Sequence, residues 1–357
     1  MPESSNTQNL KAADKRPMSQ TSTPARRPTI KEVAKLAGVS FKTVARVVNN
    51  EPSVTAERRE AVHKAMTMLN YAPNVSARQL ASKRSYLLAL VFGGGGLDNF
   101  ARAQTGAIRR CREAGYQLIV EEVVPGSETE VAARLQNARV DGVIVLPPLS
   151  FHPPLLEALR ERALRYALIS PDGGDPIASS VGLDDKLAAK QMTSRLIALG
   201  HRDIGFISGG DRRASTYRRI GYRAALETAG IPLRPDLEAE GDFSFKSGEV
   251  AARQLLGGPV RPSAIFAAND GMALGVMVAA ARLGLRVPED LSVAGFDDMP
   301  YAKLVWPELT TIRRPLREMA STAVDLLLEP EDGRAPHHVV LDFELIERGS
   351  TMQRTAP

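Results

Sequence analysis

Cysteine and long apolar runs are what this chain of 357 residues most clearly lacks. Its one cysteine, Cys111, has no partner for an intramolecular disulfide, which fits a reducing compartment. No stretch reaches the ~18 consecutive apolar residues of a membrane-spanning helix, and residues 1–27 lack the apolar run of a secretory signal. We therefore expect a cytoplasmic protein without a membrane partner.

Signals for catalysis, metal binding and cofactors are also missing. The five histidines are scattered, and only His337 and His338 are adjacent, so no metal-ligand spacing is present. Gly93–Gly96 follow an apolar stretch, but the Gly-Lys-Ser or Gly-Lys-Thr of a phosphate-binding loop does not come after them. There is no Gly-x-Ser-x-Gly elbow either. We expect no metal, no cofactor and no enzymatic activity.

Charge is divided unevenly along the chain. Residues 1–85 contain 15 Lys and Arg against 6 Asp and Glu, whereas the remainder contains 31 against 35. A basic head supplies the sequence-independent attraction to phosphates on which DNA binders depend. A membrane surface also attracts cations, but no amphipathic helix with an aromatic edge accompanies these. Residues 1–27, rich in Ser, Thr, Pro and Gln, are expected to be a disordered tail.

Residues 29–50, TIKEVAKLAGVSFKTVARVVNN, have the pattern of a helix-turn-helix. Gly38 stands where a tight turn needs a positive φ, and Ser40 is a natural N-cap for the second helix. Apolar residues at helical spacing give both helices a face to bury: Ile30, Val33, Ala34, Val44, Val47 and Val48.

The outer face of the second helix carries Phe41, Lys42 and Arg46, side chains that stack on, or donate to, base edges in a major groove. A plain three-helix bundle has a similar pattern, but the basic outer face favours DNA binding. Residues 56–69 predict a third helix that covers the first two. The polar stretch 73–85 is a linker in its simplest interpretation.

The rest of the chain alternates apolar strands with helical patterns, which predicts an α/β fold with parallel sheets covered on both faces. The predicted strands are 86–92, 116–123, 141–148, 165–170, 203–210, 263–270 and 291–298. The predicted helices lie near 100–114, 128–138, 153–162, 185–199, 214–229, 244–257 and 271–283. One sheet does not accommodate this pattern, so we expect two similar lobes, 86–184 and 185–311. A tail helix at 315–328 and a tail strand at 338–347 are expected to be shared between them.

Polar and aromatic residues gather where the strands of the second lobe end. Arg218 lies in the first turns of a predicted helix, Asn269 and Asp297 end predicted strands, and Phe243 offers a ring face. Such bidentate partners and an aromatic surface suit a polyhydroxylated ligand. Ligands of these folds bind beyond the carboxyl ends of the strands, here between the lobes.

Two further carboxylates have structural explanations. Asp298 follows Asp297 on what we expect to be an extended strand end, so the two point to opposite faces and do not serve one reaction. Asp270 ends the same predicted strand as Asn269 and belongs with it at the ligand site, and its alternative explanation is the N-cap of the helix that follows.

The chain resembles the lactose-repressor (LacI/GalR) family of bacterial transcription regulators. The family pattern T-[IL]-x-[DE]-V-A-x-x-A-G-V-S-x-x-T-V-S-R-V-[IVL]-N is met from Thr29 to Asn49, with Ala45 in place of the usual Ser. The family's L-N-Y-x-P-N and A-R-x-L follow at 69–74 and 77–80. Later landmarks are LGHRDIGFISG, RRIGYRAAL, GDFSFKSG, AANDGMALG, VPEDLSVAGFDD and LTTIRRP, and they extend the resemblance to nearly all of residues 29–350.

The resemblance implies a helix-turn-helix domain at 28–72, a hinge within 73–85 and a bilobed, periplasmic-binding-protein-like core at 86–350. By resemblance, the hinge becomes helical only on operator DNA, where Leu80 wedges open the central base step from the minor groove. The residues that we place on DNA are Thr29, Ser40, Phe41, Lys42, Thr43, Arg46, Asn49, Arg78 and Leu80. Among them, Thr43 and Asn49 are expected to hold phosphates.

The resemblance also implies an effector site in the core. The residues expected there are Ser170, Arg218, Phe243, Asn269 and Asp297. Ser170 stands where the lactose repressor has an Asp, and the family's N-P-F-F motif is eroded, which leaves Asp98 and Asn99 as weaker candidates. Asn269 in its A-N-D motif favours a sugar or sugar phosphate. Phe243 is shared with the purine-responsive branch, so a purine co-repressor is the alternative.

We therefore expect a homodimer that binds a palindromic operator in double-stranded DNA and represses carbohydrate-use genes under the control of this effector. No heptad tail follows the last predicted strand, which favours a dimer over a tetramer. A solute-binding transport protein would carry a signal peptide and no basic head. An enzyme on the same scaffold would need a base, a nucleophile or a cofactor motif, and the sequence has none of these.

Overall fold

The computed structural model describes residues 28–48, 53–71, 84–94, 96–169, 177–330 and 335–354. The chain divides before Arg84 into two compact units, and each is described by itself. Several features expected from the sequence lie outside the described residues: the tail at 1–27, residues 73–83 of the hinge segment, Asn49, Arg78, Leu80 and Ser170.

The first unit contains three helices: α1 (Ile30–Leu36), α2 (Phe41–Val48) and α3 (Ala56–Met68). Their apolar faces form one small core of Val33, Ala34, Val44, Val47, Val62 and Ala65. Gly38 has a φ of +64° in the turn between α1 and α2, as the sequence indicates. Ser40 caps α2, because its hydroxyl accepts a hydrogen bond of 3.0 Å from the backbone N–H of Thr43.

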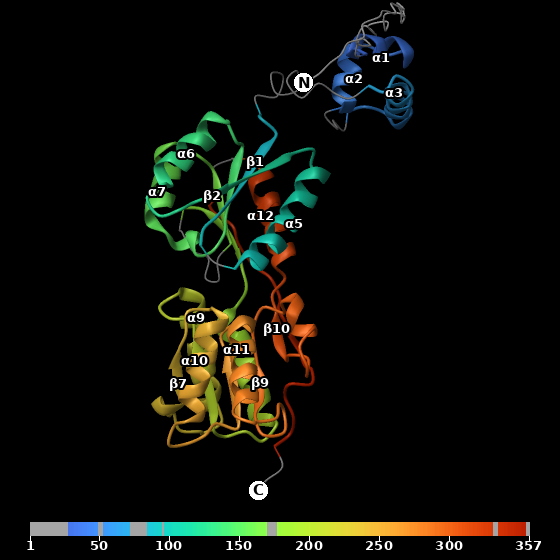
Figure 1. The fold of residues 1–357 in the computed structure, drawn as a ribbon. Coiled ribbons are helices and arrows are strands. Elements are labelled where there is room, and N and C mark those ends of the chain that lie inside the picture. The colour runs from blue at the N-terminus through green and yellow to red at the C-terminus, as the bar shows by residue number, and fades with distance from the viewer. Residues whose placement is uncertain are drawn as a thin grey trace, which may run out of the picture. The chain divides into compact units, whose positions relative to one another are not determined.

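The second unit consists of two lobes joined by crossing segments (Figure 1). The first lobe has a six-stranded parallel sheet in the order β11-β5-β4-β3-β1-β2. Its strands are β1 (Leu87–Phe92), β2 (Gln117–Glu122), β3 (Gly142–Val145), β4 (Tyr166–Ile169), β5 (Ser179–Gly182) and β11 (His338–Val340). Its helices are α5 (Leu97–Glu113), α6 (Glu128–Asn137), α7 (Pro153–Glu161) and α12 (Leu316–Leu328), with the short η1 at Leu149–Phe151.

Successive side chains along the strands of the first sheet belong to two separate hydrophobic cores, one on each face of the sheet. Leu88 and Leu90 of β1 point to the face covered by α5 and α12. Ala89 and Val91 point to the opposite face, covered by α6 and α7. A parallel strand buried on both faces must be apolar at every position, which explains the continuous apolar run in the sequence.

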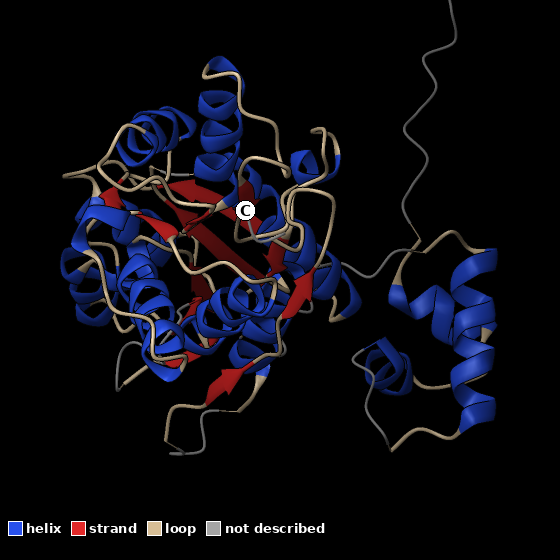
Figure 2. Ribbon diagram, turned by 90° about the horizontal axis from the view of Figure 1, so that it is seen from below, coloured by secondary structure: helices blue, strands red, loops and turns tan. Residues whose placement is uncertain are grey.

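The second lobe has a four-stranded parallel sheet in the order β7-β6-β8-β9. Its strands are β6 (Ile204–Ser208), β7 (Glu238–Glu240), β8 (Ala264–Ala267) and β9 (Ser292–Ala294). Its helices are α8 (Asp185–Ala198), α9 (Arg213–Thr228), α10 (Phe245–Leu256) and α11 (Asp270–Arg282), with the short turns η2 (Pro235–Leu237) and η3 (Pro300–Lys303). Figure 2 shows the red strands enclosed by blue helices, the arrangement that the alternating pattern predicts.

The C-terminal tail passes between the lobes. The prediction of a single strand at 338–347 is wrong. The segment forms two short strands: β11, which extends the first lobe's sheet, and β12 (Glu344–Ile346). β12 pairs antiparallel with β10 (Thr311–Arg313) beside the second lobe. The chain also returns to the first lobe between β10 and α12. Three short strands, β5, β7 and β10, had no counterpart in the expected list.

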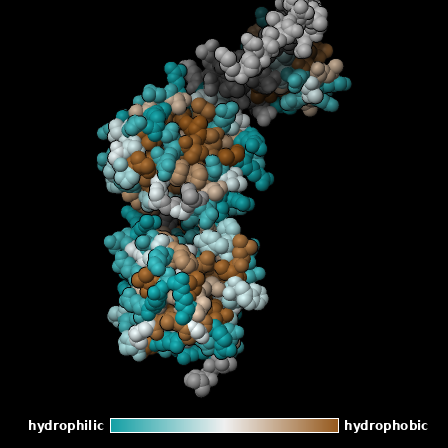
Figure 3. All heavy atoms as spheres, viewed as in Figure 1, coloured by the Kyte–Doolittle hydropathy of each residue, from teal (hydrophilic) through white to brown (hydrophobic). Residues whose placement is uncertain are grey.

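Apolar side chains remain on the surface of both lobes, where Figure 3 shows brown atoms among the teal. The most exposed large ones are Trp306 and Leu304, which keep 92% and 82% of their surface accessible. Cys111 is buried in the first lobe, and burial raises the pKa of its thiol to about 11, as fits an inert packing residue. Within the described residues, no helix has the length and apolar character needed to cross a membrane.

Gly106→Ala is expected to destabilise the first lobe, because α5 and α12 touch at this glycine. A Cβ here would lie 2.1 Å from the carbonyl oxygen of Arg317, and overpacking of this kind costs about 1–3 kcal/mol. In a helix without such a neighbour, the same change stabilises by roughly 1 kcal/mol. The free energy of unfolding in urea tests the sign, with Gly94→Ala as the control because nothing lies within 4 Å of a Cβ there. Unchanged or higher stability for Gly106→Ala would contradict the close packing.

Candidate functional site

The helix α2 separates its apolar and polar side chains cleanly. Val44 and Val47 are buried in the small core, whereas Phe41, Lys42 and Arg46 are exposed on the outer side. Phe41 keeps 62% of its surface accessible, although an aromatic ring gains by burial. A bulky ring held in solvent on the same helix as two exposed cations is the arrangement expected of a surface that binds another molecule.

The hydroxyl residues of this unit hold the starts of its helices. The backbone N–H of Thr29 donates to the Glu32 carboxylate over 2.6 Å at the start of α1. The hydroxyls of Ser40 and Thr43 are hydrogen-bonded to each other over 2.9 Å at the start of α2. These contacts fix the helix ends, and the DNA contacts that we assigned to Thr29, Ser40 and Thr43 stay predictions.

A cavity of 610 Å³ lies between the two lobes of the second unit. One side, here called the charged wall, comes from the second lobe and includes Asp185, Arg212, Arg213, Arg218, Asn269 and Asp297. The other side, the apolar wall, comes from the first lobe and includes Phe92, Phe100, Leu146, Leu149, Phe151 and Leu316. Phe243 and Arg314 also line the cavity. This volume is typical of a small-molecule site.

Arg218 is the deepest charge of the charged wall. Its side chain is 2% exposed, and its Nε donates to the Asp185 carboxylate over 2.7 Å. A second amino group lies 3.9 Å from Asp297, and the guanidinium carbon is 3.5 Å from the centre of the Phe296 ring. The Ala268 carbonyl accepts a further bond from Arg218. A buried guanidinium with this many partners has a fixed orientation.

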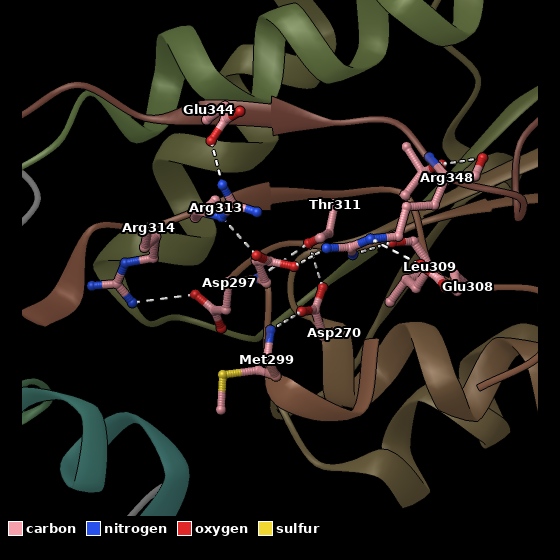
Figure 4. A network of polar contacts seen from close by, with 12 residues as sticks. Asp270, Asp297, Met299, Glu308, Leu309, Thr311, Arg313, Arg314, Glu344 and Arg348 are labelled. Atoms are coloured by element: carbon pink, nitrogen blue, oxygen red, sulfur yellow. Dashed lines mark hydrogen bonds and ion pairs between the residues drawn. The ribbon is translucent and has the colours of Figure 1, made fainter. Parts of the chain in front are cut away.

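Asp297 lies in a turn, so the prediction that it ends an extended strand is wrong. Asp297 and Asp298 have φ values of +116° and +51°. The Asp297 carboxylate faces the cavity and accepts from Arg314 over 3.3 Å (Figure 4). Asp298 turns away and pairs with Arg313 and Arg348. The two carboxylates therefore have separate partners, the outcome expected from the sequence, although a turn and not a strand separates them.

Asp270 is neither part of the cavity lining nor the N-cap of α11. Asn269 caps α11 instead, and its side-chain oxygen accepts from the backbone N–H of Met272 over 2.9 Å. Asp270 is fully buried and accepts from the hydroxyl of Thr311 and the backbone N–H of Met299 (Figure 4). Burial, with the neighbouring Asp297 charge, raises the pKa of Asp270 well above its usual value.

Phe243 and Asn269 are held together beside the cavity. The amide nitrogen of Asn269 donates to the carbonyl oxygen of Phe243 over 3.0 Å. Phe243 itself has a φ of +72°, a conformation that fixes where its ring lies. The guanidinium of Arg212 lies 5.5 Å from the centre of that ring. The aromatic face and the amide are therefore parts of one rigid corner.

The apolar wall contains two aromatic groups that meet the cavity. Phe92 and Phe100 stack with ring centres 4.1 Å apart. Phe151 lies across from the second lobe, where the guanidinium of Arg213 is 4.7 Å from its ring centre. Beside this wall, the Nε2 of His152 is 2.8 Å from the Glu128 carboxylate.

Asn99 and Arg314 both line the cavity. One atom of each, the side-chain oxygen of Asn99 and the Nε of Arg314, is buried in the protein and lacks a hydrogen-bond partner within the described residues. Buried polar atoms are normally paired, so these two atoms are exceptions beside the cavity. Asn99, a weaker candidate from the sequence, therefore lines the site, whereas Asp98 does not.

Arg102 connects the lobes behind the cavity. It belongs to α5 of the first lobe, and it donates to the carbonyl oxygens of Asp297 over 2.8 Å and of Asp298 over 3.4 Å. Its other amino group donates to the carbonyl oxygen of Arg314 over 3.1 Å. Sequence patterns gave no signal for this residue, because its partners lie almost 200 positions further along the chain. Arg314, by contrast, lies inside the LTTIRRP landmark.

Comparison with known proteins identifies the chain. A family described as bacterial regulatory proteins, lacI family, matches residues 29–74, and a periplasmic binding protein-like domain matches residues 193–351. The ribose operon repressor of Escherichia coli (strain K12) is 34% identical over 90% of this chain and 99% of its own length. The chain belongs to the lacI family. The family resemblance and the fold class inferred from the sequence are confirmed.

Further relatives of the lacI family differ in their ligands. The transcriptional repressor PurR of Shigella sonnei (strain Ss046) is 34% identical over 90% of this chain and 96% of its own length. The lac repressor dimer bound to operator and the anti-inducer ONPF has a TM-score of 0.72, 32% identity and a coverage of 92% of this chain and 100% of its own. The CelR–cellobiose complex has a TM-score of 0.70 and 34% identity over 91% of this chain and all of its own. These relatives are regulators of transcription.

The structure brings four of the five expected effector residues to one cavity: Arg218, Phe243, Asn269 and Asp297. The fifth, Ser170, lies outside the described residues. The described residues contain no group of three or more His, Cys, Asp or Glu placed to hold a metal ion. The cavity therefore offers arginine, amide, carboxylate and aromatic groups for direct binding of an organic molecule.

Asp185→Ala is expected to destabilise the protein by about 3–5 kcal/mol, since it leaves the buried Arg218 guanidinium without its principal partner. Asp211→Ala is the control, because Asp211 is an exposed carboxylate on the same cavity, and its loss is expected to change stability by no more than about 0.5 kcal/mol. Urea unfolding of both variants measures the difference. Equal effects would show that the buried pair does not hold the charged wall in place.

Proposed function

We propose that this protein is a repressor that binds a palindromic operator through the α2 surface and responds to a sugar-like effector bound between its lobes. The observation that carries the proposal is the presence, in one chain, of an exposed Phe41–Lys42–Arg46 surface and a cavity with converging polar groups. The protein would bind both partners without turnover, as a homodimer in the cytoplasm.

The charged wall supports a hydroxylated effector. Asp297 and Asn269 supply oxygen acceptors, Arg314 supplies a guanidinium, and Phe243 supplies a ring face for sugar C–H groups. By name, one relative represses a ribose operon and another is a complex with cellobiose. We place the effector against these four residues.

Control of DNA binding would follow from the position of the effector between lobes. A ligand that touches both walls favours one lobe arrangement over another, and it shifts the population only by its difference in affinity for the two. In a dimer, a lobe rotation changes the distance between two DNA-binding heads. Loss of simultaneous engagement of both half-sites then lowers operator affinity more than any single contact does.

A purine co-repressor is the second candidate. Phe243 offers a flat ring for stacking, and PurR is as similar in sequence as the ribose operon repressor. The two candidates differ in the ligand, not in the site. Operator binding measured with pentoses, hexoses, cellobiose and purine bases separates them.

Arg46→Ala is expected to weaken discrimination at one base pair of each half-site by about 1–3 kcal/mol, because an arginine reads base edges bidentately. Operators are first selected from random duplexes at near-physiological salt, since low salt rewards charge alone. Competition by single-base variants of the selected site then measures discrimination. Lys64→Ala is the matched control, because Lys64 is an exposed cation of α3. If both variants keep the same preference at every position, Arg46 does not read bases.

Asp297→Ala is expected to leave operator binding intact and to abolish its response to the effector, because the carboxylate is part of the charged wall. Asp297→Asn, which keeps the shape, is expected to retain folding and lose most of the response. Asp242→Ala is the control, since Asp242 is exposed and lies outside the cavity lining. Fluorescence anisotropy of the operator with each candidate ligand gives the readout. A normal response in both Asp297 variants would remove this residue from the site.

A further inference from the structure

Arg102 holds the backbones of two residues that line the cavity. Its Nη1 donates to the carbonyl oxygen of Asp297 over 2.8 Å, and its Nη2 donates to the carbonyl oxygen of Arg314 over 3.1 Å. The side chains of the same two residues meet at the cavity, where Arg314 donates to the Asp297 carboxylate over 3.3 Å (Figure 4). One guanidinium therefore holds both partners of this ion pair by their backbones.

The shape of the Arg102 guanidinium suits this double role. Its two terminal nitrogens project in fixed directions from one plane, so the two carbonyl oxygens are held at a set separation. Nη1 also lies 3.4 Å from the carbonyl oxygen of Asp298 and 3.6 Å from the Sδ of Met299. A lysine has a single terminal nitrogen, so it cannot reproduce this fork.

Other hydrogen bonds already join the two segments that Arg102 holds. The backbone N–H of Asp297 donates to the carbonyl oxygen of Ile312 over 2.8 Å. The carbonyl oxygen of Arg314 also accepts from the backbone N–H of Leu316 over 2.9 Å. Arg102 is therefore not needed to bring the segments together. What it adds is an attachment of both segments to α5, which belongs to the first lobe.

The helix α5 carries this attachment and part of the apolar side of the cavity as well. Asn99 and Phe100 of α5 line the cavity, and Arg102 follows them within one helical turn. Arg102 itself is not a lining residue. Over so short a distance a helix moves as one body, so a shift of the first lobe moves the lining residues and pulls on the two carbonyls together.

We propose that Arg102 is a positioning residue, which sets the geometry of the Asp297–Arg314 pair and makes that geometry depend on the position of the first lobe. The inference rests on the proposed function, in which the effector binds against this pair. The pair then has its full affinity for the effector in one lobe arrangement only. Such a difference in affinity is what a shift of populations requires.

Hydrogen exchange of the full-length protein, followed by mass spectrometry, tests the attachment without any effector. In Arg102→Gln, peptides that contain residues 297–299 and 314–316 are expected to exchange ten-fold or more faster, while peptides from β6 and β8 keep their rates. Arg109→Gln is the matched control, because Arg109 lies on the same helix with 84% of its side chain accessible. Unchanged exchange in the two peptides, or equal acceleration throughout both lobes, would overturn the proposal.

Ligand titration separates positioning from a general effect on stability. Calorimetry first finds which of ribose, glucose, galactose, cellobiose, adenine and guanine binds the unmodified protein. Arg102→Gln is expected to lower the affinity for that probe ten-fold or more. Asp297→Asn, added to Arg102→Gln, is expected to lower it less than two-fold further, because the pair is already displaced. A full effect of Asp297→Asn in this background would show that Arg102 does not act through Asp297.

Arg102→Lys keeps the positive charge and loses the fork, so we expect it to behave like Arg102→Gln in both measurements. Wild-type affinity and exchange in the lysine variant would overturn the role of the fork. If none of the six probes binds the unmodified protein, the proposed sugar and purine effectors are refuted, and the exchange measurement still decides whether Arg102 holds the pair.

Discussion

The turn at residues 297–299 is the constraint on which the rest of the core depends. Two consecutive non-glycine residues there have positive φ, and each such conformation costs of order 1–3 kcal/mol. Hydrogen bonds from two directions hold the turn in place. Arg102 donates to the carbonyl oxygens of Asp297 and Asp298, and the Asp270 carboxylate accepts from the backbone N–H of Met299. The strained backbone is what lets adjacent carboxylates serve different partners, one in the cavity and one in the ion pairs behind it.

The same turn joins three parts of the molecule that are distant in sequence. Its Asp297 reaches the cavity, its Asp298 pairs with Arg313 of β10 and with Arg348, and its carbonyls bind α5 of the first lobe. A ligand that draws on the Asp297 carboxylate therefore acts on a segment that the first lobe also holds. Arg102 is half-buried, and loss of hydration lowers its pKa. Its hydrogen bonds to the turn are therefore less exposed to competing water than bonds on the open surface.

Sequence patterns predicted those parts of the fold that depend on periodicity. β1 is apolar at every position and β6 at nearly every position, because both faces of these strands are buried, and that signal is visible in the sequence. The short strands β5, β7 and β10 were missed, since three or four residues with serine, glutamate or threonine show no period. The division of the tail was missed for a related reason, because a single run of apolar and polar residues does not show that its two ends pair in different sheets.

The candidate site was predictable where a side chain follows a strand and unpredictable where it reaches across the fold. Asn269 and Asp297 come at the ends of predicted strands, and parallel strands bring their ends to one edge. Arg102 lies in the middle of an amphipathic helix pattern, where an arginine is ordinarily a solvated residue. Asp270 shows the opposite error, because a residue in a capping motif proved to be a buried carboxylate with a raised pKa. Sequence patterns indicate contacts between residues close in sequence, whereas the contacts of Arg102 and Asp270 are with residues distant in sequence.

The division of the cavity into two walls has a consequence for how binding energy is used. Contacts on the charged wall that leave the turn at Asp297 undisturbed stabilise every lobe arrangement equally, and a ligand with equal affinity for both arrangements shifts neither. Contacts that need both walls, such as a group between Phe151 and the second lobe, count only when the lobes are close. Contacts that reach the turn at Asp297, or both walls at once, are therefore the ones that can change the balance between lobe arrangements.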